Sequence, residues 1–198
     1  MEKYGLVILA AGGSSRLGSP KQLLNYNHQS LLKHIAHIAL KLFNVVPVVV
    51  IGADKELMIK ELSNIKIEIV NNDDWVNGMS SSIKIGLAKI IEINPLIEAC
   101  IFVVCDQPFI SLQILQSLIV QYEQSKKGIV ACEYEGIIGT PVLLNKKYFS
   151  TLNLLRLEEG AKKIVKENPN DLAIIKFING EIDIDTKDDY KKLIDALR

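Results

Sequence analysis

The sequence predicts a three-layer α/β sandwich, in which helices cover both faces of a mostly parallel, mixed β-sheet. Two observations carry this prediction. Short apolar runs alternate with amphipathic stretches from one end of the 198 residues to the other, and two of these runs are apolar at every position. Alternating strands and helices form parallel βαβ units with right-handed crossovers, and strands that are apolar throughout are typical of sheets buried on both faces.

The first third of the chain contains two predicted strand–helix units. Residues 6–10 are apolar and are followed closely by a pair of glycines, which indicates a buried strand. Residues 30–43 carry apolar side chains at helical spacing behind Ser30, a candidate N-cap. Residues 45–51 are rich in β-branched side chains and form the second predicted strand, and residues 54–62 form the second helix.

The middle third repeats this pattern. A strand is predicted over residues 65–70, a helix over 80–91, a strand over 99–105 and a helix over 111–124. The run 99–105 is the second one that is apolar throughout. It therefore belongs near the centre of the sheet.

The last third breaks the alternation. Two strands over 129–132 and 141–144 follow one another across a turn at 136–139, which predicts a hairpin or an antiparallel strand in the mixed sheet. The remaining elements, in chain order, are helices over 146–154 and 159–167, a strand over 172–177 and a closing helix over 186–197 with Thr186 as N-cap.

Length and composition exclude several classes of protein. A chain of 198 residues is expected to form one domain (1–198) with a sizeable core. The 23 basic and 23 acidic residues cancel, so neither a nucleic-acid-binding surface nor a polybasic membrane anchor is indicated. No apolar stretch reaches the ~20 residues of a membrane span, and the N-terminus lacks the features of a signal peptide. We therefore expect a cytoplasmic protein without nucleic-acid or membrane partners.

The strongest functional signal is the segment 9–21, Leu-Ala-Ala-Gly-Gly-Ser-Ser-Arg-Leu-Gly-Ser-Pro-Lys. Two glycines close behind a buried strand let backbone N–H groups turn toward an anion, and Arg16 and Lys21 add two positive charges to the same loop. The glycine spacing is neither that of a dinucleotide-binding fingerprint nor that of a P-loop. From the residues alone, a phosphate-binding loop and an ordinary glycine turn beside a solvated basic surface both stay open.

The pattern L-A-A-G-x-S-x-R-x-G-x-x-K resembles the signature loop of the nucleotidyltransferases that include the molybdenum cofactor guanylyl- and cytidylyltransferases. The resemblance runs from residue 6 to residue 189 and implies a Rossmann-like sheet of the nucleotide-diphospho-sugar-transferase type. In that family the loop wraps a nucleoside triphosphate, which the Arg and the Lys neutralise. The resemblance therefore implies catalytic and nucleotide-binding roles for Arg16 and Lys21. It also implies nucleotide contacts from Ala10, Ala11, Gly12, Gly13 and Ser14.

A second element, residues 72–87, places Gly78 and three serines at the start of a predicted helix. Free backbone donors and hydroxyl groups at a helix N-terminus suit a polar ligand, and the alternative is that Ser80 simply caps the helix. The stretch Trp75-Val-Asn-Gly-Met-Ser-Ser-Ser82 resembles one with which cytidylyltransferases of this type read the base. The resemblance implies base contacts from Gly78 and Ser82.

Two aspartates are candidate metal ligands. Asp106 stands at the end of an apolar strand, where an unpaired carboxylate is costly and a bound cation removes that cost. Mg²⁺ takes one or two protein carboxylates together with phosphate oxygens and water. Asp106 and Pro108 match the family's D-x-P motif, in which the Asp holds the catalytic metal. Asp185 matches a D-I-D-T motif, which implies a second metal contact, and the alternative is that it only begins the last helix.

Two further segments correspond to segments that face the acceptor substrate in this family. Gly139-Thr-Pro141 matches a G-x-P turn. The stretch 157–162, Leu-Glu-Glu-Gly-Ala-Lys, corresponds to G-D-x-G-A-R and departs from it at the first, second and last positions. A Lys does not reproduce the two-pronged hydrogen bonding of an Arg, so these departures concern the identity of the acceptor.

The activity implied by the resemblance is transfer of CMP from CTP to the phosphate of a molybdopterin-type cofactor, with release of pyrophosphate and with Mg²⁺ as cofactor. The partners are then an NTP, a phosphorylated small-molecule acceptor and, transiently, a molybdenum enzyme or its chaperone. Cytosine is favoured because Ala11 carries a methyl group where guanine-using members have glycine, which narrows the base pocket. Two alternatives stay open: guanylyl or other nucleotidyl transfer to a sugar or alditol phosphate, and a non-catalytic nucleotide-binding partner protein.

Overall fold

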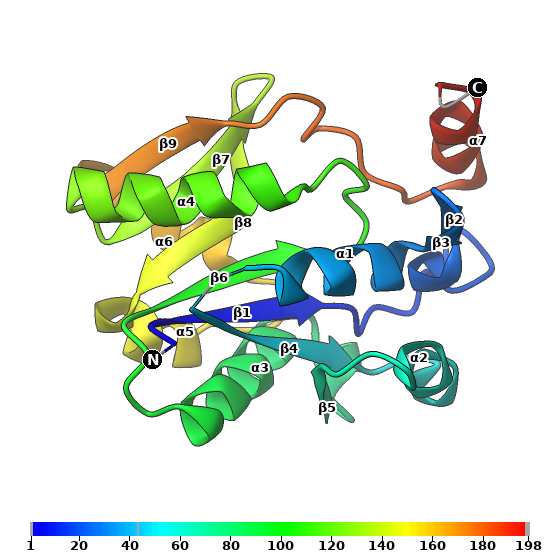
Figure 1. Ribbon diagram of the computed structural model, residues 1–198, viewed down its shortest axis with the longest axis horizontal. Helices are drawn as coiled ribbons and strands as arrows, with labels where there is room; N and C mark the ends of the chain where they lie inside the picture. The colour runs from blue at the N-terminus through cyan, green and yellow to red at the C-terminus, as the bar shows by residue number, and fades with distance from the viewer. Residues whose placement is uncertain (1, 43, 197–198) are drawn as a thin grey trace.

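The computed structural model describes residues 2–42 and 44–196, and within them it contains the predicted sandwich (Figure 1). A seven-stranded sheet has the order β5-β4-β1-β6-β8-β7-β9. Its strands, in chain order, are β1 (Tyr4–Leu9), β4 (Val45–Ile51), β5 (Glu68–Asn71), β6 (Ala99–Val104), β7 (Ile129–Tyr134), β8 (Ile137–Asn145) and β9 (Leu172–Lys176). β8 is antiparallel to both of its neighbours, and the other pairs are parallel. The predicted mostly parallel, mixed sheet is confirmed.

Helices cover both faces of this sheet (Figure 1). Those on one face are α1 (Leu31–Leu40), α2 (Lys55–Leu62) and α4 (Leu112–Ser125), and those on the other are α3 (Met79–Ile93), α5 (Phe149–Asn153) and α6 (Ala161–Glu167). The elements outside the three layers are α7 (Lys187–Ala196), the hairpin β2 (Asn25–Tyr26) and β3 (Gln29–Ser30), and the 3₁₀ turns η1 (Lys21–Leu23), η2 (Trp75–Asn77), η3 (Lys146–Tyr148) and η4 (Pro169–Asp171). None of the described helices has the length and apolar character that a membrane span requires.

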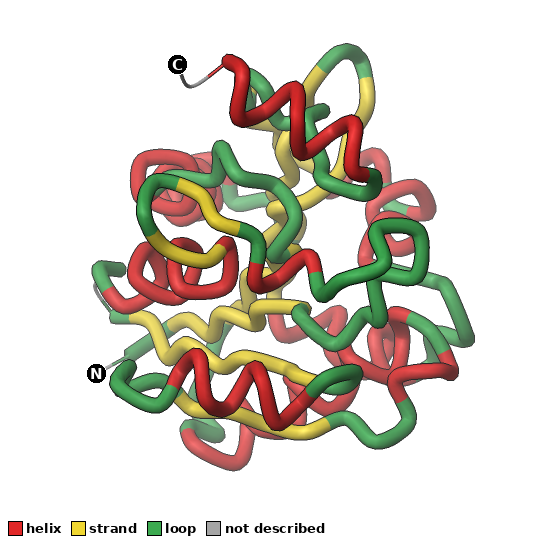
Figure 2. The backbone as a smooth tube through the Cα atoms, turned by 90° about the vertical axis from the view of Figure 1, so that its right-hand side faces the viewer, coloured by secondary structure: helices red, strands yellow, loops and turns green. Residues whose placement is uncertain are grey.

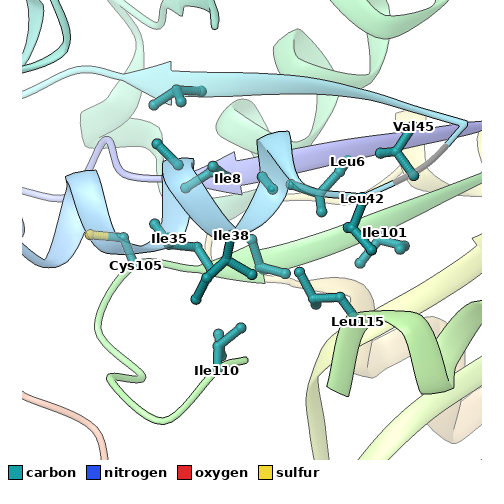
Figure 3. Close-up of a cluster of buried hydrophobic side chains, with 14 of the residues drawn as sticks. Leu6, Ile8, Ile35, Ile38, Leu42, Val45, Ile101, Cys105, Ile110 and Leu115 are labelled. Carbon is teal, nitrogen blue, oxygen red and sulfur yellow. The ribbon is translucent and has the colours of Figure 1, made fainter. Parts of the chain in front are cut away.

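The central strand β1 is buried on both faces, as its sequence predicts. Leu6 and Ile8 belong to the core cluster shared with α1 and α4, part of which Figure 3 shows. Val7, which points to the opposite face, belongs to the cluster shared with α3. All three side chains are fully buried, which explains why the run contains no polar position.

Two of the predicted N-caps are confirmed. The Ser30 hydroxyl oxygen accepts a hydrogen bond from the N–H of Lys33 at 3.1 Å. Thr186 and Asp189 form a reciprocal cap, in which each backbone N–H donates to the other side chain, at 2.8 and 3.2 Å. α1 ends at Leu40, and the predicted last residues of these two helices, 43 and 197, lie outside the described residues.

The predicted boundaries of β5 and β8 are wrong by three or more residues, and those of β1 and β7 by up to two. β5 begins three residues late, because the chain at 65–67 is still closing the turn that follows α2. β8 is longer than predicted because the turn before it is shorter, with only Glu135 and Gly136 at positive φ (47° and 76°). Such two-residue turns join antiparallel strands directly. The G-x-P segment at 139–141 accordingly lies inside β8, at a register shift, and is not a turn.

The starts of three predicted helices also differ. The helix predicted over 146–154 begins as η3 and continues as α5, and the one predicted over 159–167 begins only after Gly160, whose backbone is extended. α3 begins at Met79 with Gly78 as its cap. Ser80 is not the cap, because it lies inside the helix, where its N–H donates to the carbonyl of Leu157 at 3.0 Å.

One carboxylate beside η3 predicts a pH-dependent stability. Asp171 accepts hydrogen bonds from Lys147, from the Tyr148 hydroxyl at 2.5 Å and from the N–H of Gly128 at 3.1 Å. Burial alone raises the pKa of Asp171, but the bonds from Lys147 and Tyr148 outweigh it and lower that pKa to about 2. Ionised Asp171 therefore stabilises the fold above its ordinary pKa, and this stabilisation is lost as the pH falls toward 2.

We expect Asp171→Asn to lower the free energy of unfolding by about 1–2 kcal/mol at pH 7, because solvent screens part of the interaction. The difference from the unsubstituted protein should shrink toward pH 2. Urea denaturation at several pH values measures both quantities, with the exposed Glu181→Gln as control. A loss of equal size at every pH would contradict this assignment.

Candidate nucleotide and metal site

The loops after β1, β5 and β6 gather at the edge of the sheet where these parallel strands end (Figure 2). Ligands of open α/β sheets bind outside this edge. A cleft of about 480 Å³ opens there. Its walls come from the segment 10–21, here called the glycine loop, from η2 with the start of α3, and from the end of β6. The three segments singled out in the sequence therefore meet at one cleft.

The glycine loop turns its carbonyl groups toward the protein. The carbonyl oxygens of Ala10 and Gly12 accept hydrogen bonds from the side-chain amide of Gln22, at 2.9 and 2.8 Å. The carbonyl oxygen of Ala11 accepts one from the N–H of Ala53 at 3.1 Å. Three successive carbonyl groups therefore form hydrogen bonds with the protein and do not face a ligand.

Ser14 closes the loop. Its backbone lies at positive φ (48°), its carbonyl accepts from the N–H groups of Leu17 and Gly18, and its hydroxyl oxygen accepts from the N–H of Lys21 at 3.0 Å. Within residues 2–42 and 44–196, the N–H groups of residues 11–16 donate to no acceptor. Free N–H groups in such an array, with the carbonyls turned away, form a cradle for an anion.

Four predicted charged residues meet beside the glycine loop. The Lys21 ammonium lies 2.5 Å from a carboxylate oxygen of Asp106 and 2.9 Å from one of Asp185. Arg16 lies 2.7 Å from the other carboxylate oxygen of Asp185. The two aspartates are brought together because the N–H of Ile184 donates to the carbonyl of Asp106 at 3.0 Å, while the Ile184 side chain is fully buried.

At Lys21 and Asp185, burial and the neighbouring charges shift the pKa in opposite directions. Burial alone lowers the pKa of the Lys21 ammonium, but the nearby Asp106 and Asp185 carboxylates outweigh it and raise that pKa above its ordinary value. The hydrogen bond from Lys21 holds the pKa of Asp185 below its usual range. Burial, together with the charges of Asp185 and Asp106, raises the pKa of the neighbouring Asp183. Lys21 and Asp185 are therefore both charged at neutral pH.

The two aspartates fit a divalent cation that also binds phosphate. A single ammonium group already lies within 3 Å of both carboxylates, so one cation reaches both. In the part of the chain that the structure describes, no group of three or more His, Cys, Asp and Glu side chains could hold a metal ion. Mg²⁺ commonly uses one or two carboxylates and completes its shell with substrate phosphates and water. Asp106 and Asp185 match this type of site.

The opposite wall of the cleft is built around Trp75 and Gly78. A Cβ atom on Gly13 would lie 3.0 Å from the Trp75 ring, so the second glycine of the loop leaves room for the indole. Gly78 has φ +90°, and a Cβ atom there would lie 2.6 Å from the backbone of Leu157. This glycine lets the segment after α5 approach the start of α3.

Some of the predicted site residues line the cleft, and others are buried behind it or engaged in hydrogen bonds and ion pairs beside it. Ala10 and Ser82 are buried, Ser14 is engaged within the loop, and Asp185 contacts the cleft through Lys21 and Arg16. The Ser82 hydroxyl oxygen accepts a hydrogen bond from Asn72 at 2.9 Å. The predicted residues that line the cleft are Ala11, Gly12, Gly13, Arg16, Lys21, Gly78 and Asp106.

Sequence reasoning missed three buried amides that organise the site. Gln22 holds the glycine loop, and Asn72 donates to the hydroxyl oxygens of Ser81 and Ser82 at 2.8 and 2.9 Å. Gln107 accepts a hydrogen bond from Thr140 and donates to the carbonyl of residue 180. Each follows a predicted site residue or the end of a strand directly, and this position was the only available signal.

A smaller hollow of about 180 Å³ adjoins the cleft, with Met79 and Val104 lining both. It contains Gly139, Thr140, Gly160, Ala161 and Lys162, from the two segments that correspond to the acceptor side. Leu157, at the first position where the sequence departs from the family stretch, lies at φ +48°. Glycine adopts this conformation more readily, which explains why the family pattern has glycine there.

The comparisons with known proteins now identify the family. Residues 6–172 match the family model described as a MobA-like NTP transferase domain. The chain belongs to this family. It is 24% identical over 196 residues to the molybdenum cofactor cytidylyltransferase of Escherichia coli (strain K12), covering 96% of this chain and 95% of that protein. Membership supports nucleotidyltransferase activity, and a nucleoside triphosphate is the substrate expected for this family.

The chain is also similar to two other proteins. The chain is 32% identical over 138 residues to the nicotine blue oxidoreductase of Paenarthrobacter nicotinovorans, covering 69% of this chain and 65% of that protein. The crystal structure of a homologue of Mycobacterium tuberculosis rv0371c from mycobacterium sp. strain JC1 superposes with a TM-score of 0.85, at 28% identity over 99% of this chain and 97% of that one. The fold prediction is therefore confirmed over nearly the whole chain.

Proposed function

We propose that this nucleotidyltransferase moves CMP from CTP to the phosphate of a molybdopterin-type cofactor and releases pyrophosphate, with Mg²⁺ as its cofactor. The observation that carries the proposal is the combination of free N–H groups at residues 11–16 with Arg16 and Lys21, which are in ion-pair contact with Asp106 and Asp185. An anion cradle beside two carboxylates suits a metal-bound triphosphate. We assign catalytic roles to Arg16, Lys21 and Asp106.

Chemistry at this site requires positioning and charge stabilisation more than a nucleophilic side chain. The acceptor phosphate oxygen attacks the α-phosphorus in line, the bond to the β-phosphate oxygen breaks, and pyrophosphate leaves. Arg16 and Lys21 stabilise the negative charge that accumulates on the leaving group. Mg²⁺, held by Asp106 and Asp185, would neutralise the phosphate oxygens.

The proposed preference for cytosine rests on Ala11. Its side chain lines the cleft and is only 4% exposed. Gly52 lies directly behind it, since a Cβ atom on Gly52 would come within 2.9 Å of the Ala11 methyl group. The methyl group therefore has little room to withdraw, which penalises a bicyclic purine more than a pyrimidine.

The similarity to the cytidylyltransferase of Escherichia coli favours a molybdopterin-type acceptor. A second candidate is nucleotidyl transfer to a sugar or alditol phosphate. It is favoured by the departures from the family stretch at Leu157, Glu158 and Lys162, because Lys162 lines the hollow and Glu158 lines the adjoining cleft. The test therefore has to distinguish between these two acceptors.

Pyrophosphate release, measured with each of the four NTPs and with or without molybdopterin, tests the proposal. We expect kcat/KM for CTP to exceed that for GTP by roughly tenfold to a few hundredfold, since one misplaced methyl group is worth ~1–3 kcal/mol. The Ala11→Gly variant should reduce this ratio. A preference for GTP in the unsubstituted protein would contradict the pocket argument, and release that needs a sugar phosphate would favour the second candidate.

A further inference from the structure

Gln22 is a buried amide, 2% exposed, whose hydrogen bonds all go to the glycine loop. Its nitrogen Nε2 donates to the carbonyls of Ala10 and Gly12, at 2.9 and 2.8 Å. Its oxygen Oε1 accepts from the Ser14 hydroxyl at 3.4 Å. One side chain thus connects three positions along five residues of the loop.

These bonds determine the direction of two backbone N–H groups. In a planar trans peptide, the C=O of one residue and the N–H of the next point in opposite directions. Holding the carbonyl of Ala10 therefore turns the N–H of Ala11 away from Gln22, and holding the carbonyl of Gly12 does the same for Gly13. Ala11 and Gly13 both line the cleft, and neither N–H has an acceptor among the described residues.

The choice of glutamine at this position follows from its donor count. A single amide nitrogen carries two hydrogens and satisfies two carbonyls at once. An ionised Glu has no donor, and Met has none either. Among the described residues, no other hydrogen bond holds the carbonyls of Ala10 and Gly12, which would repel an anion if they turned toward the cleft.

We propose that Gln22 is a positioning residue, which fixes the peptides 10–11 and 12–13 so that the N–H groups of Ala11 and Gly13 face the bound phosphates. The inference rests on the proposed function, because it takes the ligand of the loop to be a triphosphate. It adds a residue that acts on phosphate binding through the backbone, without touching the nucleotide base.

The test uses Trp75, the only tryptophan of the chain, which lines the cleft and reports ligand binding by fluorescence. CTP, pyrophosphate and cytidine are titrated separately into the protein and into Gln22→Met, which keeps the side-chain length but has no donor. We expect CTP and pyrophosphate to bind about 10- to 100-fold more weakly to the variant. Cytidine, which has no phosphate, should bind equally well to both.

A second variant, Gln22→Glu, gives a readout that a merely structural role does not produce. When ionised, it adds a negative charge beside the loop, and when protonated it recovers one donor. Its affinity for pyrophosphate, relative to the unsubstituted protein, should therefore be lowest at pH 8 and should recover toward pH 5. A ratio that does not change with pH would overturn the proposal.

Tyr148→Phe serves as the control for a general loss of stability, since it removes one hydrogen bond to Asp171 at the other end of the sheet. It should lower the melting temperature without changing any of the three affinities. Equal weakening of cytidine and pyrophosphate in Gln22→Met, or no weakening at all, would overturn the role of Gln22. An unsubstituted protein that binds pyrophosphate but no CTP would refute the proposed function while still testing Gln22.

Discussion

Asp106→Asn is expected to lower the rate of nucleotidyl transfer by about 1,000-fold while leaving the fold intact. The amide keeps the shape of the carboxylate and still accepts a hydrogen bond from Lys21, which lies 2.5 Å away. It lacks the negative charge with which Asp106 is proposed to hold a divalent cation, and loss of metal assistance would cost several kcal/mol of barrier. Pyrophosphate release at saturating CTP measures the rate, and the melting temperature checks the fold.

Asp188→Asn is the matched control for this substitution. Asp188 is an exposed carboxylate in the first turn of α7, three residues beyond Asp185 in the sequence. Its replacement should leave the transfer rate within about twofold of normal. If Asp106→Asn turned over CTP as fast as this control, Asp106 would not be the ligand of the catalytic metal.

Asp106 also illustrates which parts of the site could be predicted from the sequence. A carboxylate at the end of an apolar run is costly unless it has a partner, so its position alone indicated a functional group. The partner, Lys21, was predicted as a phosphate ligand from its place in the loop. The close approach of Lys21 to both Asp106 and Asp185 could not be predicted, because it depends on how segments 85 and 164 residues apart pack together.

The elements of the fold, like the site, could be predicted from the sequence only in part. The buried strands were found because covering both faces of a strand leaves no polar position, as in β1 and β6. The hairpin β2–β3 was missed, because its turn at Asn27 and His28, both at positive φ, lacks the glycine that usually signals such turns. Gln22 was missed because a glutamine in a polar loop looks solvated until the loop folds over it.

Lys21 lies in the position that a cation bridging Asp106 and Asp185 would take. Its ammonium lies between Asp106 and Asp185, within 2.9 Å of both. Two neighbouring carboxylates repel one another, and the ammonium removes this repulsion at short range. A divalent cation that binds both carboxylates has to displace Lys21, which is then free to contact the triphosphate. Metal and nucleotide binding should therefore support each other through this one side chain.

Lys21→Met is expected to change the two affinities in opposite directions. CTP should bind about 10- to 100-fold more weakly, because a charge-assisted contact to the phosphates is lost. Mg²⁺ measured by calorimetry without nucleotide should bind more tightly, by about tenfold, because Asp106 and Asp185 lose the cation that competes for them. Lys33→Met, which removes the ion pair between Lys33 of α1 and Glu61 of α2, is the control and should change neither affinity. Weaker Mg²⁺ binding to Lys21→Met would mean that Lys21 only supports the fold of the site and does not exchange with the metal.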